Sequence, residues 1–349
     1  MAEAYDIAQA AAEIGLDIVE SDALAWTREA ETAEDGTVTF RYRNARGREI
    51  TNPNAIARLN ALAIPPAYRD VRVSPNPNGH LQAVGTDEAG RVQYRYWDQV
   101  REREKARRLS RLIRVLPRVR RRVAADLKAR GAPRERAIAA AVRLIDSAHV
   151  RVGNDGYLKA NKTRGATTLL KRQIKAKGRA LALRFKGKSG RTIAKRVESS
   201  SLVRALKSLS KLPGRRAFQY RDDKGAVRAV TAQDVNAYLA EVSGAPVTAK
   251  DFRTLAASAK AAERLAEIAP ADADRARAGQ VNRVIETVAE DLQNTPAVAR
   301  KSYVHDRIVE GFETGDLAEA YAASRGGHGV SRAERTVAKL VDETAASPA

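Results

Sequence analysis

The stretch DQVREREKARRLSRLIRVLPRVRRRVAADLKARG, residues 98–131, separates two sequence patterns and decides the fold class. Apolar residues recur in it at helical spacing, while most of the other positions are Arg or Lys. The apolar residues are Leu109, Leu112, Ile113 and Leu116. We therefore expect a helix with one face packed and one face basic, interrupted at Pro117.

Before residue 98 the chain has the pattern of β-hairpins. TVTFRYRNARGREI (37–50), RDVRVSPNPNGHLQAV (69–84) and LQAVGTDEAGRVQYRYW (81–97) each place a turn rich in Gly, Asn, Asp or Pro between β-forming runs. These runs predict a small antiparallel sheet with some helix before it. Residues 1–97 are accordingly assigned to an N-terminal β-rich domain.

After residue 131 the pattern is mainly helical. RERAIAAAVRLIDSAHVRVGN (134–154) has helical spacing and should stop at Gly153, and ALALRFKGKSGRTIAKRVES (180–199) is the one convincing hairpin in this half. Further helices are expected near 200–211, 231–243, 249–268, 274–292, 296–313 and 331–344. The fold class is α+β, with a larger, mainly helical domain over residues 98–349.

Composition narrows the chemistry and points to a polyanionic partner. The chain has 349 residues, no cysteine and four histidines, which excludes disulfides, cysteine nucleophiles and thiolate zinc sites. The net charge is +21, and residues 101–200 alone hold 31 Lys and Arg against 7 Asp and Glu. A charge so concentrated favours nucleic acid over a merely solubilising basic surface. No basic leader or membrane-length apolar run occurs, so a cytoplasmic, nucleoid-associated protein is expected.

Side chains able to cleave a phosphodiester without a metal occur at separate places in the second domain. Such cleavage needs a nucleophile, cations around the phosphorane and an acid for the leaving oxygen. Arginine suits the second task, and lysine with a lowered pKa suits the third. The candidates are Arg151 in HVRVGNDGYLK, Lys188 at the hairpin tip, Arg253 in AKDFRTLAASA, and Asn294 and Tyr303 in NTPAVARKSYVHDR.

In this order, these motifs resemble those of the type IB DNA topoisomerases, in the short form found in bacteria and poxviruses. DEAGRVQYRYW (87–97) resembles a strand of the same enzymes, so the likeness extends from about residue 35 to 325. The resemblance implies a catalytic domain related in fold to that of the tyrosine recombinases. It also implies relaxation of supercoiled duplex DNA by transient cleavage of one strand, strand rotation and religation.

The same resemblance implies the role of each residue. Tyr303 would attack the scissile phosphate and hold the 3′ end of the cut strand, while Arg151 and Arg253 would bind the non-bridging oxygens. Lys188 would protonate the departing 5′ oxygen. Asn294, at a position that is histidine in many relatives, would donate a hydrogen bond to the phosphate. Neither a metal nor a nucleotide cofactor is expected, and the chain has no GxxxxGK[ST] phosphate loop.

DNA contacts are also implied by the resemblance. Gln93, Tyr94 and Tyr96 would contact the duplex from the first domain, and Tyr157 would touch the backbone near the cut. The two domains of a monomer would close on double-stranded DNA as a clamp.

Two positions depart from the family's pattern, and two other readings remain open. Gln293 stands where relatives place Gly, and Asp306 where proline is common, which puts the local loop geometry in doubt. A tyrosine recombinase or integrase uses the same chemistry, but it usually has a histidine three residues before the second arginine, where Lys250 stands here. A non-catalytic basic DNA-binding protein would explain the charge, but not the placement of Lys188, Arg253 and Tyr303.

Overall fold

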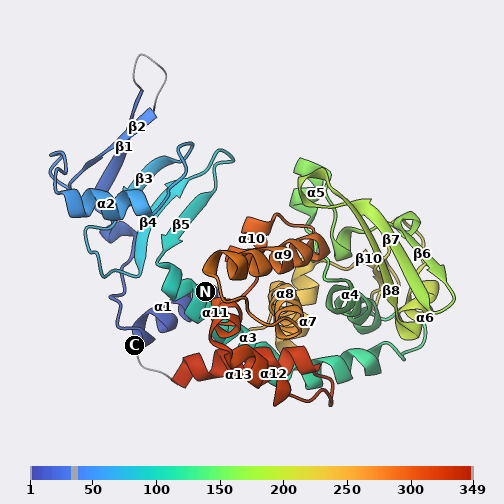
Figure 1. The fold of residues 1–349 in the computed structure, drawn as a ribbon. Helices are drawn as coiled ribbons and strands as arrows, with labels where there is room; N and C mark the ends of the chain where they lie inside the picture. The colour runs from blue at the N-terminus through green and yellow to red at the C-terminus, as the bar shows by residue number, and fades with distance from the viewer. Residues whose placement is uncertain (1, 33–37, 347–349) are drawn as a thin grey trace. The chain divides into compact units, whose positions relative to one another are not determined.

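The computed structural model describes residues 2–32 and 38–346, which form two compact units (Figure 1). The first comprises Met1–Lys105 and the second Ala106–Thr344. The helix α3, Asp98–Asp126, begins in the first unit and continues into the second. The mixed fold, with an N-terminal β unit and a larger helical unit, confirms the α+β class.

The first unit is built on one antiparallel sheet of five strands in the order β2-β1-β3-β4-β5. Its core contains Tyr42, Val71, Val73 and Ala83 of the sheet, and Leu59 of the helix α2 packs among them. The elements are α1 (Ala2–Glu13), β1 (Trp26–Thr32), β2 (Val38–Arg43), α2 (Pro53–Ala61), β3 (Arg69–Val73), β4 (Leu81–Thr86) and β5 (Val92–Tyr96).

One of the three predicted hairpins pairs differently. The strand β2 pairs with β1, and the run after its turn contributes only a bridge between Arg43 and Glu49. The sequence concealed β1 because WTREAET shows no alternation of apolar and polar residues: Arg28 stands between Trp26 and Ala30 on one side of the strand. The other two hairpins, β3–β4 and β4–β5, form as predicted.

The second unit is mainly helical and contains two small sheets. The three-stranded sheet β6-β7-β8 extends the predicted hairpin, and β9-β10 is a second hairpin that the sequence analysis missed. Its elements besides α3 are α4 (Arg134–Ala148), α5 (Asp155–Asn161), β6 (Ile174–Lys177), β7 (Ala180–Lys186), β8 (Thr192–Glu198), α6 (Ser200–Leu209), β9 (Gln219–Arg221), β10 (Val227–Ala229), α7 (Ala232–Ser243), α8 (Ala249–Ala266), α9 (Asp274–Leu292), α10 (Pro296–Ser302), α11 (Asp306–Thr314), α12 (Asp316–Ala322) and α13 (Arg332–Ala346).

Three expectations about helix ends in this unit were wrong. The helix α3 runs through Pro117, because Val119 and Val123 continue its buried stripe and their burial outweighs the lost hydrogen bond. The helix α4 ends at Ala148, where His149 takes the left-handed conformation, before Gly153 is reached. The expected helix over 296–313 is two helices, and Tyr303 lies in the break between them.

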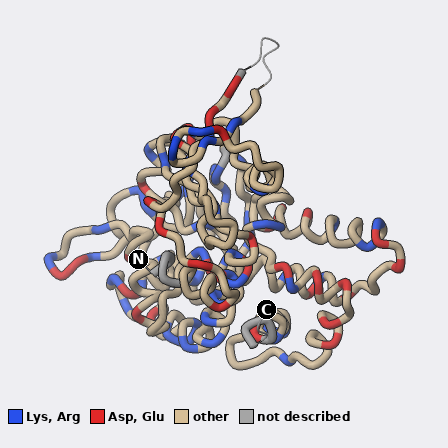
Figure 2. The backbone as a smooth tube through the Cα atoms, turned by 90° about the vertical axis from the view of Figure 1, so that its left-hand side faces the viewer, with Lys and Arg blue, Asp and Glu red and all other residues tan. Residues whose placement is uncertain are grey.

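Charged residues of both signs occur along the whole chain, as Figure 2 shows by marking Lys and Arg in blue and Asp and Glu in red. Arg120 of α3 forms ion pairs with both Asp146 of α4 and Glu334 of α13, so it joins three helices of the second unit. None of the helices within residues 2–32 and 38–346 is long and apolar enough to span a bilayer.

Candidate active site

Tyr303 lies at the break between α10 and α11, where the backbone leaves the helical conformation (φ −128°, ψ −38°). The helix α10 starts at Pro296, and the side chain of Thr295 caps it by accepting from Val298 N. Ser258 of α8 fixes the break, because its Oγ donates to Tyr303 O at 3.0 Å and accepts from His305 N at 3.1 Å. The tyrosine side chain is therefore held in one place, and the residue is 7% exposed.

Two arginines face the Tyr303 side chain. Arg151 Nη1 donates to the Tyr303 hydroxyl at 3.2 Å, and the Arg253 guanidinium carbon lies 5.3 Å from the centre of the ring. Burial raises the pKa of Tyr303, but the charges of Arg253 and Arg151 lower it by more, so the pKa falls below the usual value of a tyrosine. The site thus favours the phenolate, which is the nucleophilic form.

Arg253 is anchored by backbone carbonyls at the ends of two helices. Its guanidinium donates to His149 O, after α4, and to Leu292 O, at the end of α9, the latter at 2.9 Å. It sits near the start of α8, where Thr248 N donates to Asp251 Oδ2 at 2.7 Å. Burial is the main cause that lowers the pKa of Arg253 to about 10, and the residue is 4% exposed.

Asn294 completes the cluster through Arg151. Arg151 Nη2 donates to Asn294 Oδ1 at 2.8 Å, so one guanidinium holds both the tyrosine and the asparagine. The Nδ2 atom of Asn294 is buried and has no hydrogen-bond partner among the described residues. Within this cluster, Asn294 Nδ2 is therefore a hydrogen-bond donor that no protein acceptor satisfies.

The segment that carries Arg151 depends on a glycine opposite it. Arg151 O accepts from Ala166 N at 2.8 Å, and Val152 O accepts from Thr167 N at 2.8 Å. A Cβ at Gly165 would collide with Arg151 O and Gly153 N, so a larger residue would push the two segments apart. The position of Arg151 is therefore set by packing of two backbones.

Both departures from the family's motif have a local structural account. Gln293 caps α9 in the left-handed conformation (φ +54°) that glycine favours, so a non-glycine residue keeps the same turn here. Asp306 is the first residue of α11 and forms an ion pair with Arg300 of α10 across the break at Tyr303. Neither departure displaces Tyr303 or Asn294 from the arginines.

Lys188 lies at the tip of the β7–β8 hairpin and is exposed. Gly187 N donates to Arg191 O at 2.8 Å and closes the loop, and Arg191 Nη1 donates to Asn294 O at 3.2 Å. The loop that carries Lys188 therefore lies beside Asn294. Within the described part of the chain, no hydrogen bond or ion pair joins Lys188 to Tyr303, Arg151, Arg253 or Asn294.

The four residues expected to contact DNA differ in exposure. Tyr94 and Tyr96 of β5 lie on the same side of the strand with rings 6.3 Å apart and nearly parallel, and Tyr94 is 44% exposed. Gln93 points to the other side, where its Nε2 donates to Asp87 Oδ2 at 3.0 Å. Tyr157 of α5 is 52% exposed in the second unit. Tyr94 and Tyr157 are thus exposed, whereas the side chain of Gln93 is engaged by Asp87.

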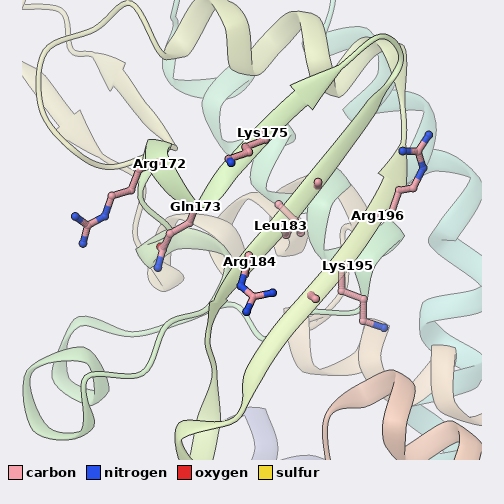
Figure 3. Close-up of a pocket in the computed structure, with 9 residues that line it drawn as sticks. Arg172, Gln173, Lys175, Leu183, Arg184, Lys195 and Arg196 are labelled. Carbon is pink, nitrogen blue, oxygen red and sulfur yellow. The ribbon is translucent and has the colours of Figure 1, made fainter.

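A basic hollow of about 450 Å³ lies on the β6-β7-β8 sheet (Figure 3). Small residues, Ala182 and Ala194, form part of its floor. Its charged lining residues are all basic: Arg172, Lys175, Arg184, Lys195 and Arg196. The sheet therefore offers a surface suited to a polyanion next to the loop of Lys188.

Sequence reasoning missed Ser258, Arg191 and the residues that anchor the end of α9. Ser258 is a polar residue on the buried side of an alanine-rich helical run, TLAASAKAA, and that contrast is a signal that could have found it. Arg191 is one of many arginines in this region, and nothing in the sequence distinguishes it. Among the described residues, no group of three or more His, Asp or Glu side chains is arranged to hold a metal ion.

The chain is similar to proteins that act on DNA topology. Residues 95–322 match the family described as the catalytic core of eukaryotic DNA topoisomerase I, and residues 39–87 match the N-terminal domain of bacterial DNA topoisomerase IB. A protein of Acanthamoeba polyphaga mimivirus named DNA topoisomerase 1B is 32% identical over 275 residues, which cover 76% of this chain and 82% of the viral protein. The first match alone spans more than half of the chain.

Proposed function

Because the chain belongs to the type IB DNA topoisomerases, we propose that it relaxes supercoiled duplex DNA by cutting and resealing one strand through Tyr303. The observation that carries this proposal is the hydrogen bond from Arg151 to the Tyr303 hydroxyl, with Arg253 beside the same ring. The cations lower the pKa of the one tyrosine that the family's motif marks as the nucleophile. The resemblance stated from the sequence is confirmed by the matches, and the chain is a type IB topoisomerase.

In the proposed cleavage step, the Tyr303 oxygen forms a bond to the scissile phosphorus as the bond from phosphorus to the 5′ oxygen breaks. Tyr303 gives up its hydroxyl proton to water, and the leaving 5′ oxygen takes one from Lys188. One phosphodiester is exchanged for another, so the 3′ end stays attached to Tyr303. Religation reverses the step, and neither ATP nor an obligatory metal takes part.

The phosphorane would be held by three side chains of the cluster. Arg151 and Arg253 would bind its non-bridging oxygens, whose negative charge increases in the transition state. Asn294 Nδ2 would donate to the phosphate, and its lack of a protein partner supports this role. Anchoring of Arg253 by two carbonyls supports a preorganised site, since the guanidinium needs no rearrangement to meet the charge.

Lys188 would act as the general acid from the hairpin tip. Its exposure and its place in the loop next to Asn294 support access to a DNA strand bound at Tyr303. Except for Lys195, whose ammonium group is engaged by Asp291, the basic residues of the hollow on β6-β7-β8 would bind phosphates of the same duplex. Tyr94, Tyr96 and Tyr157 would contact the duplex elsewhere. We propose a monomer that closes on the duplex as a clamp and works on the chromosome, in the nucleoid.

Relaxation of supercoiled plasmid in EDTA, without ATP, tests this proposal. The parent chain should relax supercoils of both signs, and Tyr303→Phe should not, because phenylalanine has no oxygen for the attack. If Tyr303→Phe still relaxes the plasmid, Tyr303 is not the nucleophile. If the parent chain binds DNA but does not relax it, the alternative of a non-catalytic DNA-binding protein is favoured. Strand exchange between two sites would instead indicate a recombinase.

A further inference from the structure

The last turn of α9 carries an ion-pair cluster that the proposed reaction does not use. The Asp291 carboxylate pairs with Lys260 of α8 and lies 3.7 Å from Lys195 Nζ of β8. Lys195 Nζ also donates to the backbone carbonyl of Asp291 at 2.6 Å. Figure 3 shows Lys195 extending from β8. Burial raises the pKa of Asp291, but Lys260 and Lys195 lower it by more, so the carboxylate is ionised at neutral pH.

This acid is not explained by the stability of α9. The carboxyl end of a helix is negative, so an aspartate in the last turn is electrostatically unfavourable there. The last turn of α9 holds no basic residue that could compensate. The two lysines that do compensate come from other elements, Lys195 from β8 and Lys260 from α8.

The residues that follow Asp291 hold two of the proposed phosphate ligands. Leu292 O accepts from Arg253 Nη2 at 2.9 Å, and Asn294 Oδ1 accepts from Arg151 Nη2 at 2.8 Å. Between them Gln293 makes a single left-handed turn. A shift of Asp291 would therefore reach both arginines within three residues of backbone.

Each lysine partner also belongs to an element that carries a proposed catalytic residue. Lys260 lies on α8 two turns after Arg253, and Lys195 lies on β8, the strand that follows the loop of Lys188. Arg191 of that loop donates to Asn294 O at 3.2 Å, a second link between the hairpin and the end of α9. Asp291 thus joins the three elements on which the site is built.

We propose that Asp291 is a positioning residue for strand cleavage. Its carboxylate, held between Lys195 and Lys260, fixes Leu292 O and Asn294 against Arg253 and Arg151, and it does so without contacting the reacting phosphate. The inference rests on the proposed function, since it assigns Asp291 a part in the chemistry proposed for Tyr303.

The test is the variant Asp291→Asn, which keeps the shape of the side chain and removes its charge. The rate of single-turnover cleavage at saturating DNA should fall about 10- to 100-fold, because a displacement near 1 Å is enough for such a loss. DNA affinity, measured with Asp291→Asn in a Tyr303→Phe background, should stay that of Tyr303→Phe alone. Glu286→Gln is the matched control, since it removes the same charge from an exposed position of α9 and should leave the rate unchanged.

A double-mutant cycle separates positioning from general loss of structure. Lys195→Met should also slow cleavage, and adding it to Asp291→Asn should cost less than the product of the two single effects, because both remove one interaction. Asp291→Glu, which restores the charge, should recover part of the rate. If Asp291→Asn melts below the assay temperature, Lys195→Met alone carries the same expectation of slower cleavage at unchanged affinity.

Parental cleavage by Asp291→Asn, or a loss of rate matched by a loss of affinity, would overturn the inference. The inference would also be overturned if the rate loss in the double mutant equalled the product of the losses in Asp291→Asn and Lys195→Met. The proposed function fails separately, if Tyr303→Phe still forms a covalent adduct. An adduct lost in Tyr303→Phe together with an unaffected Asp291→Asn would refute only the role of Asp291.

Discussion

Two buried tyrosines of the second unit sit in opposite electrostatic surroundings. Tyr303 is 7% exposed and faces Arg151 and Arg253, whereas Tyr238 of α7 is 5% exposed and its hydroxyl donates to Asp126 Oδ2 at 2.7 Å. Burial raises the pKa of both. The arginines reverse that effect at Tyr303, and Asp126 adds to it at Tyr238, whose pKa is strongly raised.

Burial therefore does not decide which tyrosine can act as a nucleophile, whereas the sign of the neighbouring charge does. A phenolate at Tyr238 would lie against a carboxylate, so that hydroxyl is fixed as a donor. A phenolate at Tyr303 would lie against Arg151 and Arg253, the two cations that we propose bind the phosphate. The same residue type is thus held as a hydrogen-bond donor at Tyr238, whereas at Tyr303 its surroundings support the nucleophilic role that we propose.

The largest expected effect is on the rate of strand cleavage, which should differ between substitutions of the two tyrosines. Tyr303→Phe should lower the rate of strand cleavage by about 10⁴-fold or more, since no other group replaces the nucleophile. Tyr238→Phe should cleave at the parental rate, because its hydroxyl faces Asp126, away from the arginine pair. Single-turnover cleavage of a labelled duplex measures both, and equal losses would break the distinction between the two sites.

Removing the charge of Arg253 should shift the pKa of Tyr303. In Arg253→Met, burial is opposed by Arg151 alone, so the pKa of Tyr303 should rise and the increase of cleavage rate with pH should move to higher pH. The rate at neutral pH should also fall about 100- to 1000-fold. Arg253→Lys keeps the charge and should leave the pH profile nearer its parental position. An unshifted profile in Arg253→Met would show that this charge does not tune Tyr303.

His149 extends the comparison to a half-buried base. Burial, with the charges of Lys260 and Lys195, lowers the pKa of His149 to about 4, while Asp146 and Asp291 act in the opposite direction. The folded state then binds fewer protons than the unfolded state between about pH 6.5 and 4. The free energy of unfolding should therefore fall by about 1 to 3 kcal/mol as pH drops through that window, and be fully restored above it.

Denaturant unfolding followed by helical circular dichroism checks this prediction. His149→Asn, which also tolerates the left-handed conformation at this position, should lose less stability over the same pH window. Equal pH dependence of the two proteins would assign the acid sensitivity to other groups.

The smallest effect should be on stability at Tyr238. Tyr238→Phe removes one hydrogen bond to Asp126, which still pairs with Arg122, so the free energy of unfolding should fall by about 1 kcal/mol at neutral pH. Thermal unfolding measures it. A loss near zero would indicate that Arg122 alone satisfies Asp126.

The sequence predicted what local patterns encode. The β7–β8 hairpin follows from alternation around the loop at Lys188, and the start of α8 at Ala249 agrees with the helix expected over residues 249–268. The left-handed turn at Gln293 was not predictable, because only glycine would have marked it.

Structural features that depend on contacts between residues far apart in the chain could not be predicted from the sequence. The helical spacing of Val304, Ile308 and Phe312 continues through Tyr303, so the break there depends on Ser258 of another helix. Asp291 meets Lys195 across 96 residues of sequence. No window of sequence holds both residues, and spacing alone could not bring them together.

The most direct test of the central claim is to identify the residue and the DNA end in the covalent adduct. Cleavage of a labelled duplex is stopped with denaturant, and trypsin then cuts after Lys301 and Arg307 to release the peptide SYVHDR, residues 302–307. The account predicts that this peptide carries the 3′ end of the cut strand on Tyr303. An adduct on the 5′ end, or on any other peptide, would contradict it.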